Sequence, residues 1–283
     1  MQIQIRHWLV SFAIISALVI GGCSRQEAAP LNSNSSPTGA ATTASVSPTA
    51  TTSNNPQLSN LPRLDGKATV VMVVKGSPIT MEVDGTNAPY TAGNFVDLVQ
   101  RGVYNGLVFH RVVREPQPFV VQGGDPQSKD PNFPPDQLGT GGFTDPATSQ
   151  PRYIPLEIKP KGSENPVYGK TLKSAGVSAA PVLQHTRGAV AMARSSLPDS
   201  ASSQFYIALA DLQFLDGDYA VFGQVTQGMD AVDKIQQGDR IESAKVTQGL
   251  ENLKNSNSGK SPGASPSPGG SPSPAASPAA SPQ

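Results

Sequence analysis

Apolar runs and the turn residues between them predict most of the secondary structure of this chain. Between residues 68 and 83, the runs VVMVV and ITMEV are separated by a short segment at 75–78, in which Gly76 and Pro78 mark a turn. We therefore expect a β-hairpin there. Further β-rich runs predict strands at 107–113, 119–122, 188–193, 204–209, 219–225 and 241–246.

Two segments have helical character. Thr91 offers an N-cap, apolar residues then recur at helical spacing from 95 to 99, and Gly102 follows as a C-terminal stop. A second helix is expected at 229–236. Many strands with only two helices indicate an antiparallel β architecture, in which closure of the sheet removes exposed edges. We expect a closed barrel, although this pattern alone does not separate a barrel from a β-sandwich.

Composition divides the chain into four segments. Ser, Thr, Ala, Asn and Pro dominate residues 24–61, and Ser-Pro units repeat toward the C-terminus. Segments of this kind cannot bury enough apolar surface to offset the entropy of ordering. We therefore expect one folded domain between two tails, with the following bounds: a signal peptide at 1–22, a flexible linker at 23–62, the domain at 63–250 and a disordered tail at 251–283.

The N-terminus has the features of an export signal. Arg6 and His7 precede an apolar run at 8–20 that is too short for a comfortable membrane span and is typical of a signal peptide. The sequence IGGC, which ends at Cys23, resembles the lipobox of bacterial lipoproteins. This resemblance implies a lipid on Cys23 and an exported protein held on the extracytoplasmic side of a membrane, in the periplasm or at the cell surface. An uncleaved anchor is the alternative.

Charge and side-chain inventory exclude several classes of function. The 21 basic residues balance 21 acidic ones, which gives no electrostatic argument for binding nucleic acid. His7, His110 and His185 are scattered without ligand spacing, so we expect no metal and no other cofactor. Cys23 is the only cysteine, and the folded domain therefore has no internal disulfide. We expect the protein to act as a monomer.

The run FHRVV at 109–113, followed by FVVQGGDP at 119–126, contains the candidate chemistry. In a strand, alternate residues share a face, so Arg111 lies on one definite side of the first run. Gly123 and Gly124 then permit a sharp change of direction. The pattern predicts a fixed cation beside an apolar pocket.

These runs resemble the signature of the cyclophilins, which are peptidyl-prolyl cis-trans isomerases. The later segments HTRGAVAMA at 185–193, SSQFYIALA at 202–210 and FLDGDYAVFGQV at 214–225 match the same family in the same order. Four ordered matches are far more specific than one short motif. The resemblance implies an eight-stranded β-barrel capped by two helices, with proline-containing polypeptides as partners.

The resemblance also implies roles for individual residues. Arg111 stands at the position of the family's catalytic arginine, whose guanidinium approaches the prolyl nitrogen, and Phe119 and Gln122 complete the catalytic positions. The positions that line the substrate groove are Val120, Ala193, Gln204, Tyr206, Phe214, Leu215 and Tyr219.

Some of these positions depart from the family pattern. Val120, Tyr206 and Tyr219 stand where members commonly have Met, Phe and His. Arg194 stands where many members have Asn, and the segment that follows it alters the groove wall. These changes bear on the affinity for substrate more than on the chemistry.

Two hypotheses follow for the function. The first is a membrane-tethered isomerase that accelerates Xaa-Pro rotation and assists the folding of exported proteins. The second is a catalytically weak binding module on the same scaffold, which holds a protein partner near the membrane. The second rests on two stretches that look like enlarged loops, at 125–138 and at 144–184, since long loops beside a groove are natural places for partner selection.

Overall fold

The computed structural model describes residues 58–254 of the 283-residue chain. The expectations for Cys23, the signal peptide and most of the two tails therefore concern residues outside this range. Within 58–254, no helix has the length and apolar character that crossing a bilayer requires.

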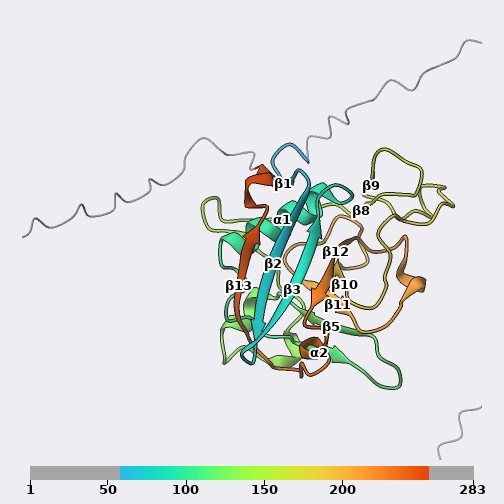
Figure 1. Ribbon diagram of the computed structural model, residues 1–283. Coiled ribbons are helices and arrows are strands. Elements are labelled where there is room, and N and C mark those ends of the chain that lie inside the picture. Colours follow the sequence, from blue (N-terminus) through green and yellow to red (C-terminus); the bar gives the residue numbers. More distant parts are fainter. Residues whose placement is uncertain (1–57, 255–283) are drawn as a thin grey trace, which may run out of the picture. The chain divides into compact units, whose positions relative to one another are not determined.

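Eight antiparallel strands form one curled sheet, which confirms the expectation of a mainly β fold (Figure 1). Their order across the sheet is β13-β2-β3-β12-β10-β11-β5-β4. The bounds are β2 (Lys67–Val74), β3 (Ser77–Asp84), β4 (Arg111–Val113), β5 (Val120–Gly123), β10 (Ala189–Met192), β11 (Phe205–Ala208), β12 (Val221–Gln227) and β13 (Ile241–Gln248).

The hairpin of β2 and β3 has a tighter turn than expected. Val74 pairs with Ser77, so only Lys75 and Gly76 lie in the turn, and Pro78 belongs to β3. Both turn residues have a positive φ, 49° for Lys75 and 70° for Gly76. Two central residues of this kind match the right-handed twist of the strands, which is why a two-residue turn suffices.

The two edge strands, β13 and β4, are not paired with each other in the sheet. The segments that precede them nevertheless exchange backbone hydrogen bonds. Phe109 N donates to Asp239 O at 2.8 Å, and Ile241 N donates to Leu107 O at 2.8 Å. These bonds lie on either side of an antiparallel bridge between Val108 and Arg240. Irregular backbone before β4 therefore bonds to the backbone at the start of β13.

Helix α1 (Pro89–Gln100) does not start as expected, because Ala88 and not Thr91 is its N-cap residue. Pro89 suits the first turn since its fixed φ is already helical. Thr91 lies inside that turn, where its N and Oγ1 both donate to Glu157 at 2.7 Å. Tyr90 N donates to the same carboxylate at 3.3 Å. A distant carboxylate thus satisfies the free N–H groups of the helix, and the N-cap prediction for Thr91 was wrong.

The C-terminal stop of α1 is confirmed. Gly102 has a φ of 68°, its N donates to Val99 O, and Val103 N donates to Leu98 O. This is the pattern of a Schellman motif, in which a left-handed residue closes the last turn.

Helix α2 (Met229–Val232) is shorter than the expected 229–236. Beyond Val232 the chain continues in tighter turns, since Lys234 N donates to Ala231 O and Ile235 N to Val232 O, and the Arg114 guanidinium binds two carbonyls there. Its Nη2 donates to Val232 O at 3.2 Å and to Ile235 O at 2.8 Å.

The stretches expected to be enlarged loops contain short elements of their own. The first, at 125–138, holds two 3-10 turns, and the second, at 144–184, holds two small strand pairs. A further pair joins the two ends of the described chain. These elements are η1 (Pro126–Lys129), η2 (Pro135–Gln137), β6 (Thr144–Asp145), β7 (Gln150–Pro151), β8 (Glu157–Ile158), β9 (Val167–Tyr168), β1 (Arg63–Leu64) and β14 (Leu253–Lys254), with η3 (Gln213–Leu215) and η4 (Leu250–Asn252) elsewhere.

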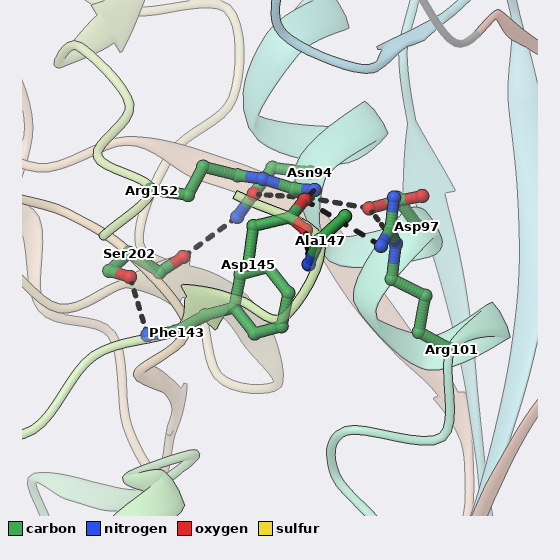
Figure 2. A network of polar contacts seen from close by, with 8 residues as sticks. All are labelled: Asn94, Asp97, Arg101, Phe143, Asp145, Ala147, Arg152 and Ser202. Atoms are coloured by element: carbon green, nitrogen blue, oxygen red, sulfur yellow. Dashed lines mark hydrogen bonds and ion pairs between the residues drawn. The ribbon is translucent and has the colours of Figure 1, made fainter. Parts of the chain in front are cut away.

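A buried polar network anchors the second enlarged loop to α1 (Figure 2). The Asp97 carboxylate, 3% exposed, accepts from Arg152 Nη1 at 2.6 Å and from Arg101 Nε at 2.9 Å. The Arg152 guanidinium also lies 4.8 Å from the centre of the Phe143 ring. Because a buried charge is costly without a partner, this network holds the loop against the helix.

The main core lies between α1 and the concave side of the sheet. The fully buried rings of Phe95, Phe205 and Phe222 meet there, with centroids 5.4 Å apart for Phe95 and Phe205 and 4.9 Å for Phe95 and Phe222. Each buried ring contributes about 1.5–3 kcal/mol. Leu58 and Leu61 belong to the same core, so packing begins before β1.

Candidate active site

A row of polar side chains runs from Gln204, just before β11, across β5 to Arg111 on β4. Arg111 on β4 pairs in register with Gln122 on β5, and its Nη1 donates to Gln122 Oε1 at 3.2 Å. Gln122 Nε2 donates to Gln204 Oε1 at 3.1 Å. Gln204 Nε2 donates in turn to Gly141 O at 2.7 Å. Every amide in this row has one defined orientation, because each is held at both ends.

The Arg111 guanidinium lies at the exposed end of this row, 5.5 Å from the centre of the Phe119 ring. A guanidinium has five N–H donors in a planar fork, and the contact with Gln122 engages one nitrogen. The site therefore presents a permanent cation with directed donors beside an aromatic surface.

A cluster of apolar side chains adjoins Arg111, and we call it the apolar pocket because its members include the residues expected to receive a proline ring. Val120 and Tyr206 are buried, and four partly buried residues pack against the same cluster, namely Phe119, Ala193, Leu215 and Tyr219. All the residues expected to bind a proline ring are thus brought together. The ring of Tyr219 meets that of Tyr206 edge-on, with centroids 6.2 Å apart.

Phe214 forms the outer rim of this pocket. Its ring is stacked on Phe119 with centroids 6.1 Å apart, and 70% of the residue is exposed. An aromatic side chain so exposed gains little from packing inside the domain and is available to a ligand.

A polar groove of about 340 Å³ runs from Gln122, Ala193 and Gln204 away from the apolar pocket. Sequence reasoning did not identify most of the residues that line it. They are Gly139, Thr140, Gly141, Gly142, Tyr153, Arg194, Ser195, Ser200 and Ser202. Most of them belong to no motif, because the wall is built by backbone and by segments next to the enlarged loops. For Arg194 and the segment after it, the sequence indicated only an altered groove wall, and Ser202 was identified only as the start of the run at 202–210.

Asp125 holds the backbone of this wall. Its Oδ2 accepts from Gly139 N at 2.6 Å and from Gly141 N at 3.1 Å. A Cβ at position 141 would lie 2.2 Å from the Asp125 carboxylate, so only glycine fits. The carbonyl of Gly141 that orients Gln204 is thereby held in place.

Arg194, the residue that departs from the family pattern, does not point freely into solvent. Its Nε and Nη2 donate to Asp218 O at 3.1 and 2.8 Å, and its guanidinium lies 4.6 Å from the centre of the Tyr219 ring. Arg194 therefore joins the wall of the groove to the wall of the apolar pocket.

Two buried histidines lie near the site. His110 precedes Arg111, and both of its ring nitrogens lack a hydrogen-bond partner among the described residues. His185 contacts Asp216 and Tyr206 behind the apolar pocket. Burial lowers the pKa of both imidazoles, so both are neutral at pH 7.

The comparison with known families agrees with this geometry. The family model described as cyclophilin type peptidyl-prolyl cis-trans isomerase/CLD matches residues 69–255. The chain belongs to the cyclophilin family. Among cyclophilin relatives, a putative thylakoid lumen peptidyl-prolyl cis-trans isomerase of Synechocystis is 42% identical over 212 residues, which cover 71% of this chain and 52% of the relative.

Two further cyclophilin relatives are also similar to this chain. The chloroplastic isomerase CYP38 of Arabidopsis thaliana is 42% identical over 214 residues, covering 69% of this chain and 46% of the relative. A probable peptidyl-prolyl cis-trans isomerase of Brucella abortus is 35% identical over 184 residues, covering 64% of this chain and 78% of the relative. The chain thus spans about half the length of the first two relatives and most of the third.

Proposed function

We propose that this protein is a peptidyl-prolyl cis-trans isomerase. The observation that carries the proposal is the oriented guanidinium of Arg111, held by the Gln122 and Gln204 amides at the mouth of an apolar pocket. Membership of the cyclophilin family supports it.

The reaction needs neither a nucleophile nor a metal. Conjugation of the amide gives rotation a barrier of about 18–20 kcal/mol, and in the twisted amide the prolyl nitrogen regains its lone pair. A donor from Arg111 binds that lone pair, which the planar amide does not offer. This hydrogen bond is therefore stronger in the transition state than in either ground state, which is the condition for catalysis.

The other residues hold the substrate. In this proposal Phe119 and Gln122 act with Arg111. Phe119 forms the apolar surface nearest the guanidinium, and Gln122 holds the guanidinium through a hydrogen bond. The proline ring occupies the apolar pocket, and the flanking peptide follows the amide row and the rim. The residues assigned to binding are Val120, Ala193, Gln204, Tyr206, Phe214, Leu215 and Tyr219.

We also propose that the sheet functions as a closed barrel. The backbone bonds between the segments before β4 and β13 support closure, since they leave the described sheet without a free edge at this point. Closure would fix β4, and with it Arg111, from both sides.

The location proposed is extracytoplasmic, with a lipid on Cys23 as the membrane anchor. The signal-like N-terminus and the IGGC motif support this, and the two relatives named from the thylakoid lumen and the chloroplast agree with an organellar or exported setting. Exported proteins that contain Xaa-Pro bonds would then be the clients of a monomeric enzyme. The proposed bounds remain signal peptide 1–22, linker 23–62, domain 63–250 and tail 251–283.

The test is the cis-to-trans rate of a short Xaa-Pro peptide with the full-length chain and its Arg111→Ala variant. A charged hydrogen bond is worth about 1.5–3 kcal/mol, so the variant should lose about tenfold to a hundredfold in kcat/KM. Arg63→Ala is the matched control, because Arg63 pairs with Asp65 on β1 and belongs to no part of the site. Absence of acceleration by the folded wild type would refute the proposal and favour a binding module.

A further inference from the structure

His185 lies behind the apolar pocket and contacts two of its walls. The residue is 1% exposed and precedes β10. Its Nδ1 lies 2.8 Å from Asp216 Oδ1, and its Nε2 lies 2.9 Å from the Tyr206 hydroxyl. Both nitrogens of one buried imidazole are therefore engaged, each by a different element of the site.

The first wall is η3, a turn of only three residues that carries Phe214 and Leu215. Asp216 follows directly, and its Oδ1 accepts from both Nδ1 and the backbone N of His185 at 2.8 Å. Leu212 N, just before the turn, donates to His185 O at 2.7 Å. Both ends of η3 are thus attached to the same residue.

The second wall is Tyr206 on β11, which packs against Val120 and Tyr219 in the pocket. The Tyr206 ring lies nearly parallel to the imidazole, with centroids 6.0 Å apart and an interplanar angle of 14°. The hydroxyl is the only group of the Tyr206 side chain that can form a hydrogen bond to His185. Phe, the commoner residue of the family at this position, has no hydroxyl.

The hydrogen bonds define the tautomer of His185. The Asp216 carboxylate only accepts, so Nδ1 carries the proton, and Nε2 accepts from the Tyr206 hydroxyl. Burial lowers the pKa of His185, and Asp216 opposes this only in part. The other groups that face the pair are Gln184, whose Nε2 donates to Asp216 at 3.4 Å, and Tyr219 and Arg194, which lie beyond Tyr206.

We propose that His185 is a positioning residue of the active site, which sets the width of the proline pocket by tying η3 to the Tyr206 ring. The inference rests on the proposed isomerase function for its kinetic consequence but not for its geometry. His185 itself touches no substrate. The other contacts that hold this wall are apolar and less directional: Leu212 and Leu215 pack in the same cluster as Tyr206, and Phe214 stacks on Phe119.

Two amide substitutions separate the two contacts. In His185→Asn the side-chain nitrogen replaces Nδ1 and keeps the bond to Asp216. In His185→Gln the longer side chain places its amide where Nε2 was, and the amide oxygen can accept from the Tyr206 hydroxyl. Tyr206→Phe removes the second bond from the opposite side and leaves the ring in place. Steady-state kinetics of the full-length chain with a proline-containing peptide, and the Kd of that peptide, provide the readout.

The tie predicts that Tyr206→Phe and His185→Asn each raise KM and Kd about fivefold, in line with the loss of one buried hydrogen bond, and leave kcat within a factor of two. Once Tyr206 is Phe, adding His185→Asn should cost nothing further. His185→Gln should instead loosen η3, which is seen as faster amide exchange at Leu215 and Asp216.

Several outcomes would overturn the inference. Unchanged KM and Kd in both Tyr206→Phe and His185→Asn would show that the pocket does not need the tie, and independent effects in the double variant would show that the two residues act separately. An inactive wild type that still binds the peptide would refute the isomerase proposal alone, since Kd and amide exchange still test the role of His185. An inactive wild type without peptide binding would refute both.

Discussion

Gln204→Met offers a sharp test of how the arginine is oriented. Methionine has nearly the length and volume of glutamine but forms neither of the two side-chain bonds of Gln204, the one accepted from Gln122 at 3.1 Å and the one donated to Gly141 O at 2.7 Å. Arg111 keeps its bond to Gln122, but Gln122 loses the anchor that sets its amide plane. The substitution therefore acts on the Arg111 guanidinium indirectly, through Gln122.

The magnitude follows from these two bonds. Each is worth about 1 kcal/mol, and the abandoned partners line a groove that water can enter, so the free energy of unfolding should fall by about 1–2 kcal/mol. For a domain of this size that lowers Tm by about 2–8 °C. We expect kcat/KM for an Xaa-Pro peptide to fall about tenfold, mainly through kcat, because misorientation weakens a bond made in the transition state.

The matched control is Gln224→Met. Gln224 also donates to a backbone carbonyl, that of Arg187 at 2.8 Å, but it lies on β12 outside the amide row. It should lose comparable stability and retain its activity. If Gln204→Met keeps kcat/KM within twofold of the wild type while Tm falls as expected, the amide row does not orient Arg111 and the reasoning fails.

Three further predictions concern stability. Glu157→Ala should lower the free energy of unfolding, measured by urea denaturation, by at least about 1–2 kcal/mol, because the first turn of α1 loses its only described side-chain acceptor. The control is Glu164→Ala, an exposed residue of the same loop, and a similar loss of stability there would contradict this reasoning. Arg152→Leu should lower the free energy of unfolding by about 3–5 kcal/mol, because the buried Asp97 carboxylate loses one of its partners. Adding Asp97→Leu should restore part of this stability in the same denaturation assay. If the double variant is no more stable than Arg152→Leu, the ion pair does not stabilise the fold. Burial lowers the pKa of His110 and His185, so below about pH 6.5 the unfolded chain binds more protons than the folded chain. The free energy of unfolding should therefore fall as the pH drops below about 6.5, by at most about 1.4 kcal/mol per pH unit for each histidine. His185→Gln should make this pH dependence less steep.

The sequence was sufficient for most of the local elements, and it selected the residues that form the centre of the proposed site. The hairpin follows from apolar runs around Gly76, and the end of α1 follows from the conformational freedom of Gly102. Arg111, Gln122 and Gln204 were identified because they lie in motifs that resemble a known family. Strand register then places Gln122 opposite Arg111 and opposite Tyr206. Gln204 lies two residues before Tyr206, on the same face of the chain, and so comes within reach of Gln122.

What the sequence could not predict depends on partners far away in the chain. Thr91 has the chemistry of an N-cap, but Glu157, 66 residues later, accepts from the first turn instead, and the N-cap residue is Ala88, three positions earlier. The residues after Val232 have helical character, but their polar groups bond to distant or non-helical partners: Ile235 O accepts from Arg114, and Gln236 N donates to Asp239. His185 looked isolated because its partners, Tyr206 and Asp216, are 21 and 31 positions away.

The pairing of β1 with β14 places the two ends of the described domain side by side, with Arg63 opposite Lys254. The described chain therefore enters and leaves the domain at neighbouring positions. A short linker across this pair would close the backbone into a circle, and new termini could then be opened at a surface turn such as Lys75–Gly76 without separating the strands that carry Arg111 and Gln204. The same feature means that a tag or label attached at either end of the described domain would lie beside the other end.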